Sequence, residues 1–206
     1  MAKRNQKSYS KFTFSDLGDL GLRTEIVDLF KGDIIAPVQP SAWLLETLKR
    51  GSAFSLNTEK AKSEFIIAPV LNELHQNNQE VFAVYSGFNF TVDAAQGLQG
   101  FCDFLLAKLP LNIIPDTPII AVVEAKLNAA LSAAIPQCAA EMYATRLWND
   151  KRNQPLKVIY GTVTTGDNWL FLRMKEGKVV EVDNRSYTLS QLDSLLGTWQ
   201  HIINQF

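Results

Sequence analysis

Cysteine and histidine are scarce, with two of each in 206 residues. Neither residue type recurs at the spacing of a zinc finger. Cys102 and Cys138 both lie in apolar surroundings, which favours free, buried, reduced thiols of an intracellular protein. The sequence also lacks a Ser or Cys nucleophile elbow and a glycine-rich loop followed by Lys-Ser or Lys-Thr, so neither a triad hydrolase nor a P-loop nucleotide site is expected.

An excess of charge of one sign is also missing. The 20 Lys and Arg residues and 21 Asp and Glu residues leave a formal net charge of -1. This balance gives no overall attraction for nucleic acid, so such a partner would need a local basic patch. No apolar run approaches the roughly 18 residues of a membrane span, and the polar, basic start MAKRNQKSYSKF lacks the apolar core of a signal peptide. We therefore expect a cytoplasmic protein without a membrane partner.

The residues that are present predict one mixed α/β domain. With 47% hydrophobic residues, four Trp and twelve Phe, the chain can fill a substantial core. Hydrophobic periodicity predicts a helix, three strands, a second helix, further strands and a last helix. These elements are expected over 57–76, 81–92, 101–109, 118–127, 136–149, 155–182 and 188–203. Residues 1–56 are expected to form an N-terminal extension with a short helix over 41–49, packed on a main domain of residues 57–206.

The stretch IIAVVEAKLN, residues 119–128, places two opposite charges at the end of an apolar strand. Five apolar residues predict a strand that is buried on both faces of a sheet. Strand side chains alternate between faces, so Glu124 and Lys126 point the same way. Because burial of an unpaired charge is costly, another charged group should share that face.

Two further acidic residues have apolar neighbours. Asp103 interrupts FCDFLLA, and Glu64 precedes FIIAPVL on a predicted helical face. If the three strands pair in order, Asp103 and Glu124 lie on adjacent strand ends, and the helix brings Glu64 over them. Converging carboxylates repel one another, and a hard divalent cation such as Mg²⁺ removes this repulsion. Lys126 would then lie beside a metal-bound water and a phosphate.

This ordered set resembles the PD-(D/E)xK nuclease superfamily, and in detail the N-terminal nuclease domain of the R subunits of type I restriction enzymes. The E-x-K sequence follows an apolar run in VVEAK, a glutamine begins the next helix in PQCAAEMYA, and a Thr-Gly turn precedes an aromatic residue in TVTTGDNWLFLRM. The resemblance covers about residues 57–175. It implies a restriction endonuclease-like fold, in which a mixed central sheet is flanked by helices.

The resemblance also implies residue roles. Asp103, Glu124 and the backbone carbonyl of Ala125 would hold Mg²⁺ or Mn²⁺. Lys126 would position the attacking water, Glu64 would support or complete the metal site, and Gln137 would orient the lysine or contact the phosphate backbone. DNA is the implied substrate, with a second copy of the chain or a partner subunit as further partners. Cys102 stands where the family has proline, and Tyr143 falls six residues after Gln137. No helicase motor follows, so the resemblance is to a standalone nuclease domain.

Structural alternatives exist for the same residues. A Glu–Lys pair at a strand end is common at protein surfaces, and Gln137 can be a polar residue at a helix start. Glu141 is expected to be solvated or to serve as a capping partner, and Trp169 to anchor a hairpin rather than to stack on bases. For the whole chain, the alternative is a module that keeps the fold and binds nucleic acid or a partner subunit without cleavage.

Overall fold

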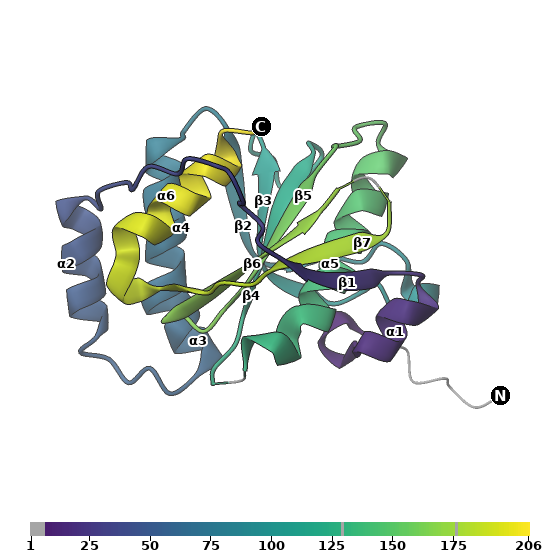
Figure 1. Cartoon of the computed structure of the whole chain (residues 1–206), viewed down its shortest axis with the longest axis horizontal. Helices are drawn as coiled ribbons and strands as arrows, with labels where there is room; N and C mark the ends of the chain where they lie inside the picture. Colours follow the sequence, from purple (N-terminus) through teal and green to yellow (C-terminus); the bar gives the residue numbers. More distant parts are fainter. Residues whose placement is uncertain (1–6, 129, 176) are drawn as a thin grey trace.

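A mixed β-sheet forms the centre of the molecule in the computed structural model, which describes residues 7–128, 130–175 and 177–206 (Figure 1). The strand order is β1-β7-β6-β5-β4-β3-β2, and the short β8 pairs with β6. The β4–β5 and β1–β7 pairs are parallel and the other pairs are antiparallel. The strands are β1 Arg23–Val27, β2 Phe82–Asn89, β3 Phe101–Lys108, β4 Ile119–Ala125, β5 Ile159–Thr164, β6 Asn168–Met174, β7 Val179–Asp183 and β8 Tyr187–Thr188.

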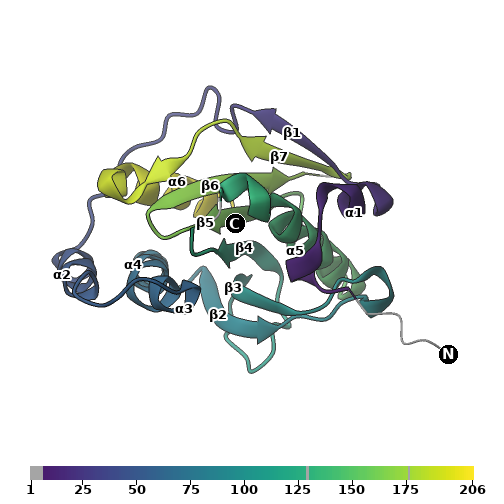
Figure 2. The same ribbon diagram turned by 90° about the horizontal axis from the view of Figure 1, so that it is seen from below.

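Helices cover both faces of this sheet (Figure 2). Side chains of α1 and α5 fill the core on one face, and side chains of α2, α4 and α6 fill the core on the other. The helices are α1 Phe14–Asp19, α2 Ala42–Gly51, α3 Glu59–Lys62, α4 Ala68–Asn77, α5 Leu131–Lys151 and α6 Leu192–Ile203. The predicted mixed sheet with flanking helices is therefore confirmed.

Strand β4 lies inside both cores. All seven of its residues are buried, as the apolar run predicts. Val122 belongs to the core under α5, and Val123 belongs to the core under α4 and α6. The last residues of β4 are therefore packed between the two cores and between the neighbouring strands β3 and β5.

The helix predicted over 57–76 is confirmed in three consecutive pieces. Thr58 caps α3 by accepting a hydrogen bond from the backbone nitrogen of Ala61 at 3.0 Å. A π-helical segment, Ser63–Ile67, then leads into α4. Pro69 lacks the N–H that would complete the regular helical bond to Phe65, which accounts for the irregular turn before it.

Helix α5 begins earlier than predicted. The sequence placed Pro136 at the first helical position, whereas the helix starts at Leu131 and Pro136 lies inside it. The proline leaves the carbonyl of Ser132 without its regular partner, and the exposed position of Ser132 gives that carbonyl access to solvent. The helix therefore starts about one and a half turns before the predicted position.

The N-terminal segment is part of the sheet. The short helix predicted over 41–49 is α2, capped by Ser41. The same segment also supplies β1, which the sequence analysis missed and which pairs in parallel with β7 from Arg23↔Val179 to Val27↔Asp183. The predicted boundary at residue 57 thus does not separate a helical extension from a complete sheet.

The last helix packs on its own domain. The apolar stripe of α6 is buried against the sheet, so this stripe is not a free face for a second copy. Along the part of the chain that the structure describes, every helix is too short or too polar to traverse a lipid bilayer.

Candidate functional site

Two acidic side chains meet where β3 and β4 run side by side. The antiparallel register pairs Phe104 with Val123, so Asp103 and Glu124 follow on adjacent strands. The backbone nitrogen of Ala125 donates a hydrogen bond to Asp103 Oδ2 at 2.8 Å. The Glu124 side chain is only 2% exposed, which confirms the predicted buried carboxylate at the end of this strand.

Lys126 follows directly after β4 and turns back toward Glu124. Its backbone nitrogen donates to the carbonyl of Thr164 at 2.8 Å, which continues the β4–β5 pairing by one residue. The ammonium forms an ion pair with Glu124 Oε1 and lies 3.2 Å from Gln137 Oε1. The lysine is thus held between a strand carboxylate and a helix amide.

Helix α5 covers this pair and adds a second buried carboxyl. Gln137 Nε2 donates to Glu141 Oε1 at 3.1 Å, one helical turn along. Glu141 is completely buried, so the expectation that it would be solvated is wrong. Small neighbours on α5 allow the helix to approach the sheet closely, and this approach excludes water from the carboxyl.

Burial shifts the pKa of all three carboxyl groups upward. Removal from water, with the charge of Asp103 as the second cause, raises the pKa of Glu124 to about 8. Burial also raises the pKa of Asp103, against the lowering effect of the hydrogen bond from Ala125. For Glu141, burial and then the charge of Glu124 raise the pKa well above its ordinary value. The site thus holds more acidic groups than it can easily keep ionised together.

The pKa of Lys126 shifts in the direction that preserves its charge. Burial lowers it, but the charge of Glu124 and its hydrogen bond outweigh that effect, and the pKa of the ammonium rises. Lys126 is therefore a cation, and it pairs with the Glu124 carboxyl group.

Glu64, predicted to complete the site, lies elsewhere. Its exposed side chain pairs with Lys60 one turn earlier on the helix. The physical reason is the sheet itself: α4 covers one face, whereas Glu124 and Lys126 turn toward α5 on the other. Glu59, in the first turn of α3, is the helix carboxylate whose charge raises the pKa of both Asp103 and Lys126. Its exposed, polar surroundings gave the sequence analysis no signal for it.

The donor atoms at the strand ends suit a hard cation. Among residues 7–128, 130–175 and 177–206, no three Asp, Glu, His or Cys side chains are grouped as a metal site. Mg²⁺ needs only one or two carboxylates and keeps several waters. Asp103 and Glu124 supply two carboxylates, and the Ala125 carbonyl is a third oxygen donor between them in sequence. Glu124 Oε2 is buried without an ordinary hydrogen-bond donor in the described structure, so the residues fit such an ion.

Other sequence predictions are confirmed by simple contacts. Trp169 is fully buried, and its indole nitrogen donates to the carbonyl of Gly166 at 2.8 Å, as a hairpin anchor does. Cys102 and Cys138 are free and buried.

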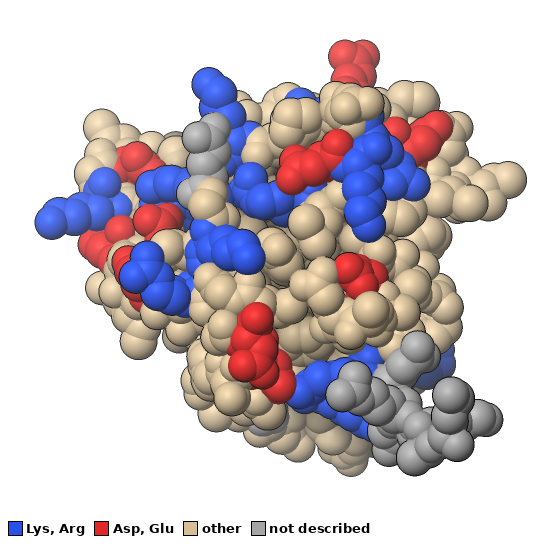
Figure 3. All heavy atoms as spheres, turned by 90° about the vertical axis from the view of Figure 1, so that its right-hand side faces the viewer, with Lys and Arg blue, Asp and Glu red and all other residues tan. Residues whose placement is uncertain are grey.

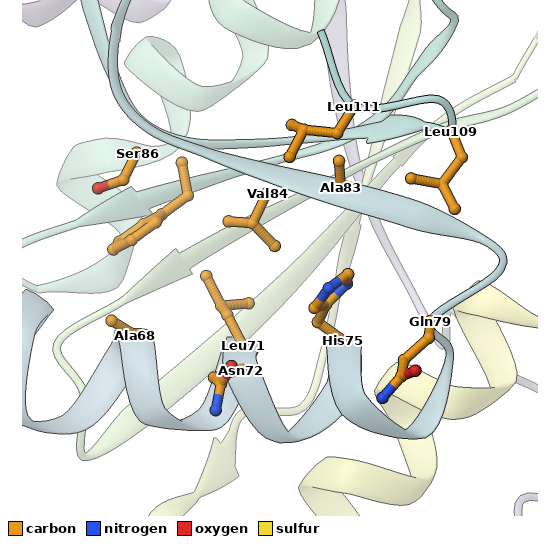
Figure 4. Close-up of a pocket in the computed structure, with 11 residues that line it drawn as sticks. Ala68, Leu71, Asn72, His75, Gln79, Ala83, Val84, Ser86, Leu109 and Leu111 are labelled. Carbon is orange, nitrogen blue, oxygen red and sulfur yellow. The ribbon is translucent and has the colours of Figure 1, made fainter. Parts of the chain in front are cut away.

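The molecule also has an apolar groove of about 520 Å³ between α4 and the edge strand β2 (Figure 4). Leu71 and Val84 face each other across it, and Leu109 and Leu111 line its far end. His75 is its one ionisable lining residue among those described, and Nδ1 of that ring is 2.9 Å from the carbonyl of Phe82. None of the residues that line this groove belongs to the carboxyl cluster, so the groove and the candidate site are separate features of the molecule.

No family model, curated protein or solved structure matches this chain. A function for this chain must therefore be inferred from its own side chains.

Proposed function

We propose that this protein is a Mg²⁺- or Mn²⁺-dependent nuclease that hydrolyses phosphodiester bonds in DNA. The observation that carries the proposal is the cluster of Asp103, Glu124 and Lys126 at two adjacent strand ends, with Gln137 on the ammonium. This cluster brings together five of the six positions that the resemblance to PD-(D/E)xK nucleases implies: Asp103, Glu124, Ala125, Lys126 and Gln137.

The arrangement of elements supports the same assignment. An antiparallel β2-β3-β4 unit carries Asp103 and Glu124, α5 follows, and β5 then pairs in parallel with β4. A helix between two parallel neighbours places its buried face over the strand ends. This order agrees with the mixed central sheet and flanking helices that the resemblance implies.

In the proposed mechanism, the chain supplies positioning and charge. Asp103, Glu124 and the Ala125 carbonyl would hold the metal ion, which when bound polarises a water and a phosphate oxygen. Lys126 orients the attacking water and offsets the negative charge that develops on the phosphate. Gln137 fixes the ammonium over the site. The limited exposure of Glu124 keeps these interactions in a region of low dielectric, where they are stronger.

A second candidate is a module that binds nucleic acid or a partner subunit without cleaving. Two observations favour it. Glu64 pairs with Lys60 away from the carboxyl cluster, and the face in Figure 3 mixes acidic with basic side chains instead of presenting one large basic field. A nucleic acid would then bind through local contacts, and cleavage would require a partner that completes the site.

A cleavage assay tests the proposal directly. Plasmid, linear duplex and single-stranded DNA are incubated with the parent protein and with Lys126→Met, each in Mg²⁺, Mn²⁺ or EDTA. We expect metal-dependent cleavage by the parent alone, since loss of the ammonium leaves the proposed metal ligands in place. Equal cleavage by both proteins would reveal a contaminating nuclease or a wrong mechanism. No cleavage by either would favour the non-cleaving module.

A further inference from the structure

Four side chains at the site form a closed ring of polar contacts. The Lys126 ammonium contacts Glu124 Oε1 and Gln137 Oε1, and Gln137 Nε2 donates to Glu141 Oε1. The carboxyl groups of Glu141 and Glu124 are neighbours, which closes the ring. Two members come from β4 and its end, and two come from α5.

The chemistry of the members fixes the direction of every contact. An ammonium only donates, so the oxygen of the Gln137 amide must face Lys126 and its nitrogen must face Glu141. Glu141 Oε1 must then accept. Its other oxygen, Oε2, is buried without a hydrogen-bond donor in the described structure. Only one orientation of the Gln137 amide therefore gives both Lys126 and Glu141 a suitable hydrogen-bond partner.

Glu141 occupies this place at a cost. A completely buried carboxyl group without a cationic partner is unfavourable, and an apolar residue would fill the same space more easily. Sequence alone assigned it no role in catalysis. Its contacts in the structure are with two side chains of the proposed catalytic site.

We propose that Glu141 is a positioning residue, which holds the Gln137 amide in the orientation that fixes Lys126 beside Glu124. The inference rests on the proposed function, since it assigns the ring a task in that site. Glu141 acts through Gln137 and does not itself touch the substrate.

The ring is tested first without any cleavage. Modification of Lys126 by an amine-reactive reagent is followed by peptide mass spectrometry, with the exposed Lys49 as an internal reference. Glu141→Leu removes the acceptor for the Gln137 amide, and we expect Lys126 to react several-fold faster, on the order of 3- to 10-fold, as expected for the loss of one supporting hydrogen bond. Glu141→Gln keeps an acceptor for Gln137, so labelling should return close to the parent rate.

A double-mutant cycle separates positioning from general loosening. Gln137→Leu and Glu141→Leu break the same contact, so the double variant should label Lys126 no faster than Gln137→Leu alone. Thr145→Val is the matched control, because Thr145 is a buried α5 residue whose hydroxyl also has no partner among the described residues. In the Thr145→Val protein, Lys126 should be modified at the same rate as in the parent. If Glu141→Leu fails to fold, Glu141→Met takes its place.

Cleavage kinetics then test the catalytic consequence. We expect Glu141→Leu to lower kcat by about 10- to 100-fold with little change in KM, as is typical when a residue that orients another is lost, and Glu141→Gln to recover most of it. Unchanged Lys126 labelling in Glu141→Leu, or labelling effects that multiply in the double variant, would overturn the positioning role. A parent that cleaves nothing, with the labelling pattern as expected, would refute the nuclease while leaving the ring established.

Discussion

At the residue scale, the most informative contact is the one between Lys126 and Gln137. A lysine at a strand end ordinarily points into water with its side chain free to move. Here Glu124 and the Gln137 amide hold the ammonium, and the Lys126 side chain is only 21% exposed. Two acceptors from different elements specify its position more narrowly than a single surface ion pair does. This constraint distinguishes the cluster from a simple Glu–Lys pair.

The metal prediction concerns Asp103. With excess Mg²⁺ or Mn²⁺, the parent and Lys126→Met should both unfold at higher temperature than in EDTA, because an ion bound only by the folded state stabilises it by about 2.7 kcal/mol at a hundred times its dissociation constant. Asp103→Ala should lose this response. A thermal melt of the three proteins provides the measurement, and an equal metal response in Asp103→Ala would exclude that carboxylate as a ligand.

The pH prediction concerns Glu124. Its pKa rises from 4.5 to about 8 on folding, so the folded state holds the proton more tightly than the unfolded state does. The associated stability is fully present below pH 4.5 and decreases as pH rises toward 8, by at most about 1.4 kcal/mol per pH unit for one group. Urea unfolding in EDTA between pH 6 and 9 measures this decrease.

Glu124→Gln is the control for this measurement. It removes the titrating group and should flatten the decline in the free energy of unfolding. A decline as steep in this variant as in the parent would assign the effect to other groups.

At the element scale, the site depends on how closely α5 approaches β5. A Cβ atom at Gly161 would lie 2.4 Å from Met142 Sδ and 2.8 Å from Cys138 Sγ. Those two residues flank Gln137 and Glu141 on the same helix. The glycine therefore allows the helix to bring its polar residues down to the strand ends.

Gly161→Ala should push α5 away from the sheet. We expect a loss of about 1–3 kcal/mol in the free energy of unfolding, as for other overpacked cores, together with weaker cleavage. Gly18→Ala is the matched control, because Gly18 is exposed on α1 with no atom within 4 Å of the added Cβ. It should leave stability unchanged or raise it by up to about 1 kcal/mol. Urea unfolding distinguishes the two, and equal stability of Gly161→Ala and the parent would show that α5 adjusts freely.

At the scale of the whole molecule, the N-terminal segment and the last strands form one structure. Strand β1 covers the edge of β7, and Leu17, Leu22, Leu29 and Phe30 are buried in the two cores. A fragment of residues 57–206 would expose this edge and the facing apolar surfaces.

We expect deletion of residues 1–56 to prevent cooperative folding. The fragment should aggregate or show far-ultraviolet circular dichroism without the near-ultraviolet signal of packed aromatic rings. Size-exclusion chromatography and circular dichroism measure both properties. A monomeric fragment with a sharp unfolding transition would restore the predicted boundary at residue 57.

The sequence predicted the local features of the site and the main elements of the fold. Strong periodicity in the apolar runs specified β4, α4 and α6, and side-chain alternation placed Glu124 and Lys126 on one face. Three features escaped it. The strand β1 has little apolar pattern, since it is a mostly exposed edge strand. The start of α5 was predicted at Pro136, whereas the helix begins at Leu131. Glu141 was predicted to be solvated, and nothing in its local sequence indicated that it is buried.

What the sequence determined by itself is therefore short-range: which segments form helices and strands, and which neighbouring charges share a strand face. The tertiary structure decided which elements meet. The helical segment 59–77 is amphipathic, and α5 carries small side chains, so each can pack on a sheet. Nothing in their own sequences determines which face of the sheet they cover. Once α5 took the face of Glu124, Gln137 and Glu141 joined the site and Glu64 was left outside it. The physical reason is that strand pairing and helix packing are set by burial across the whole domain, which involves residues far apart in the chain.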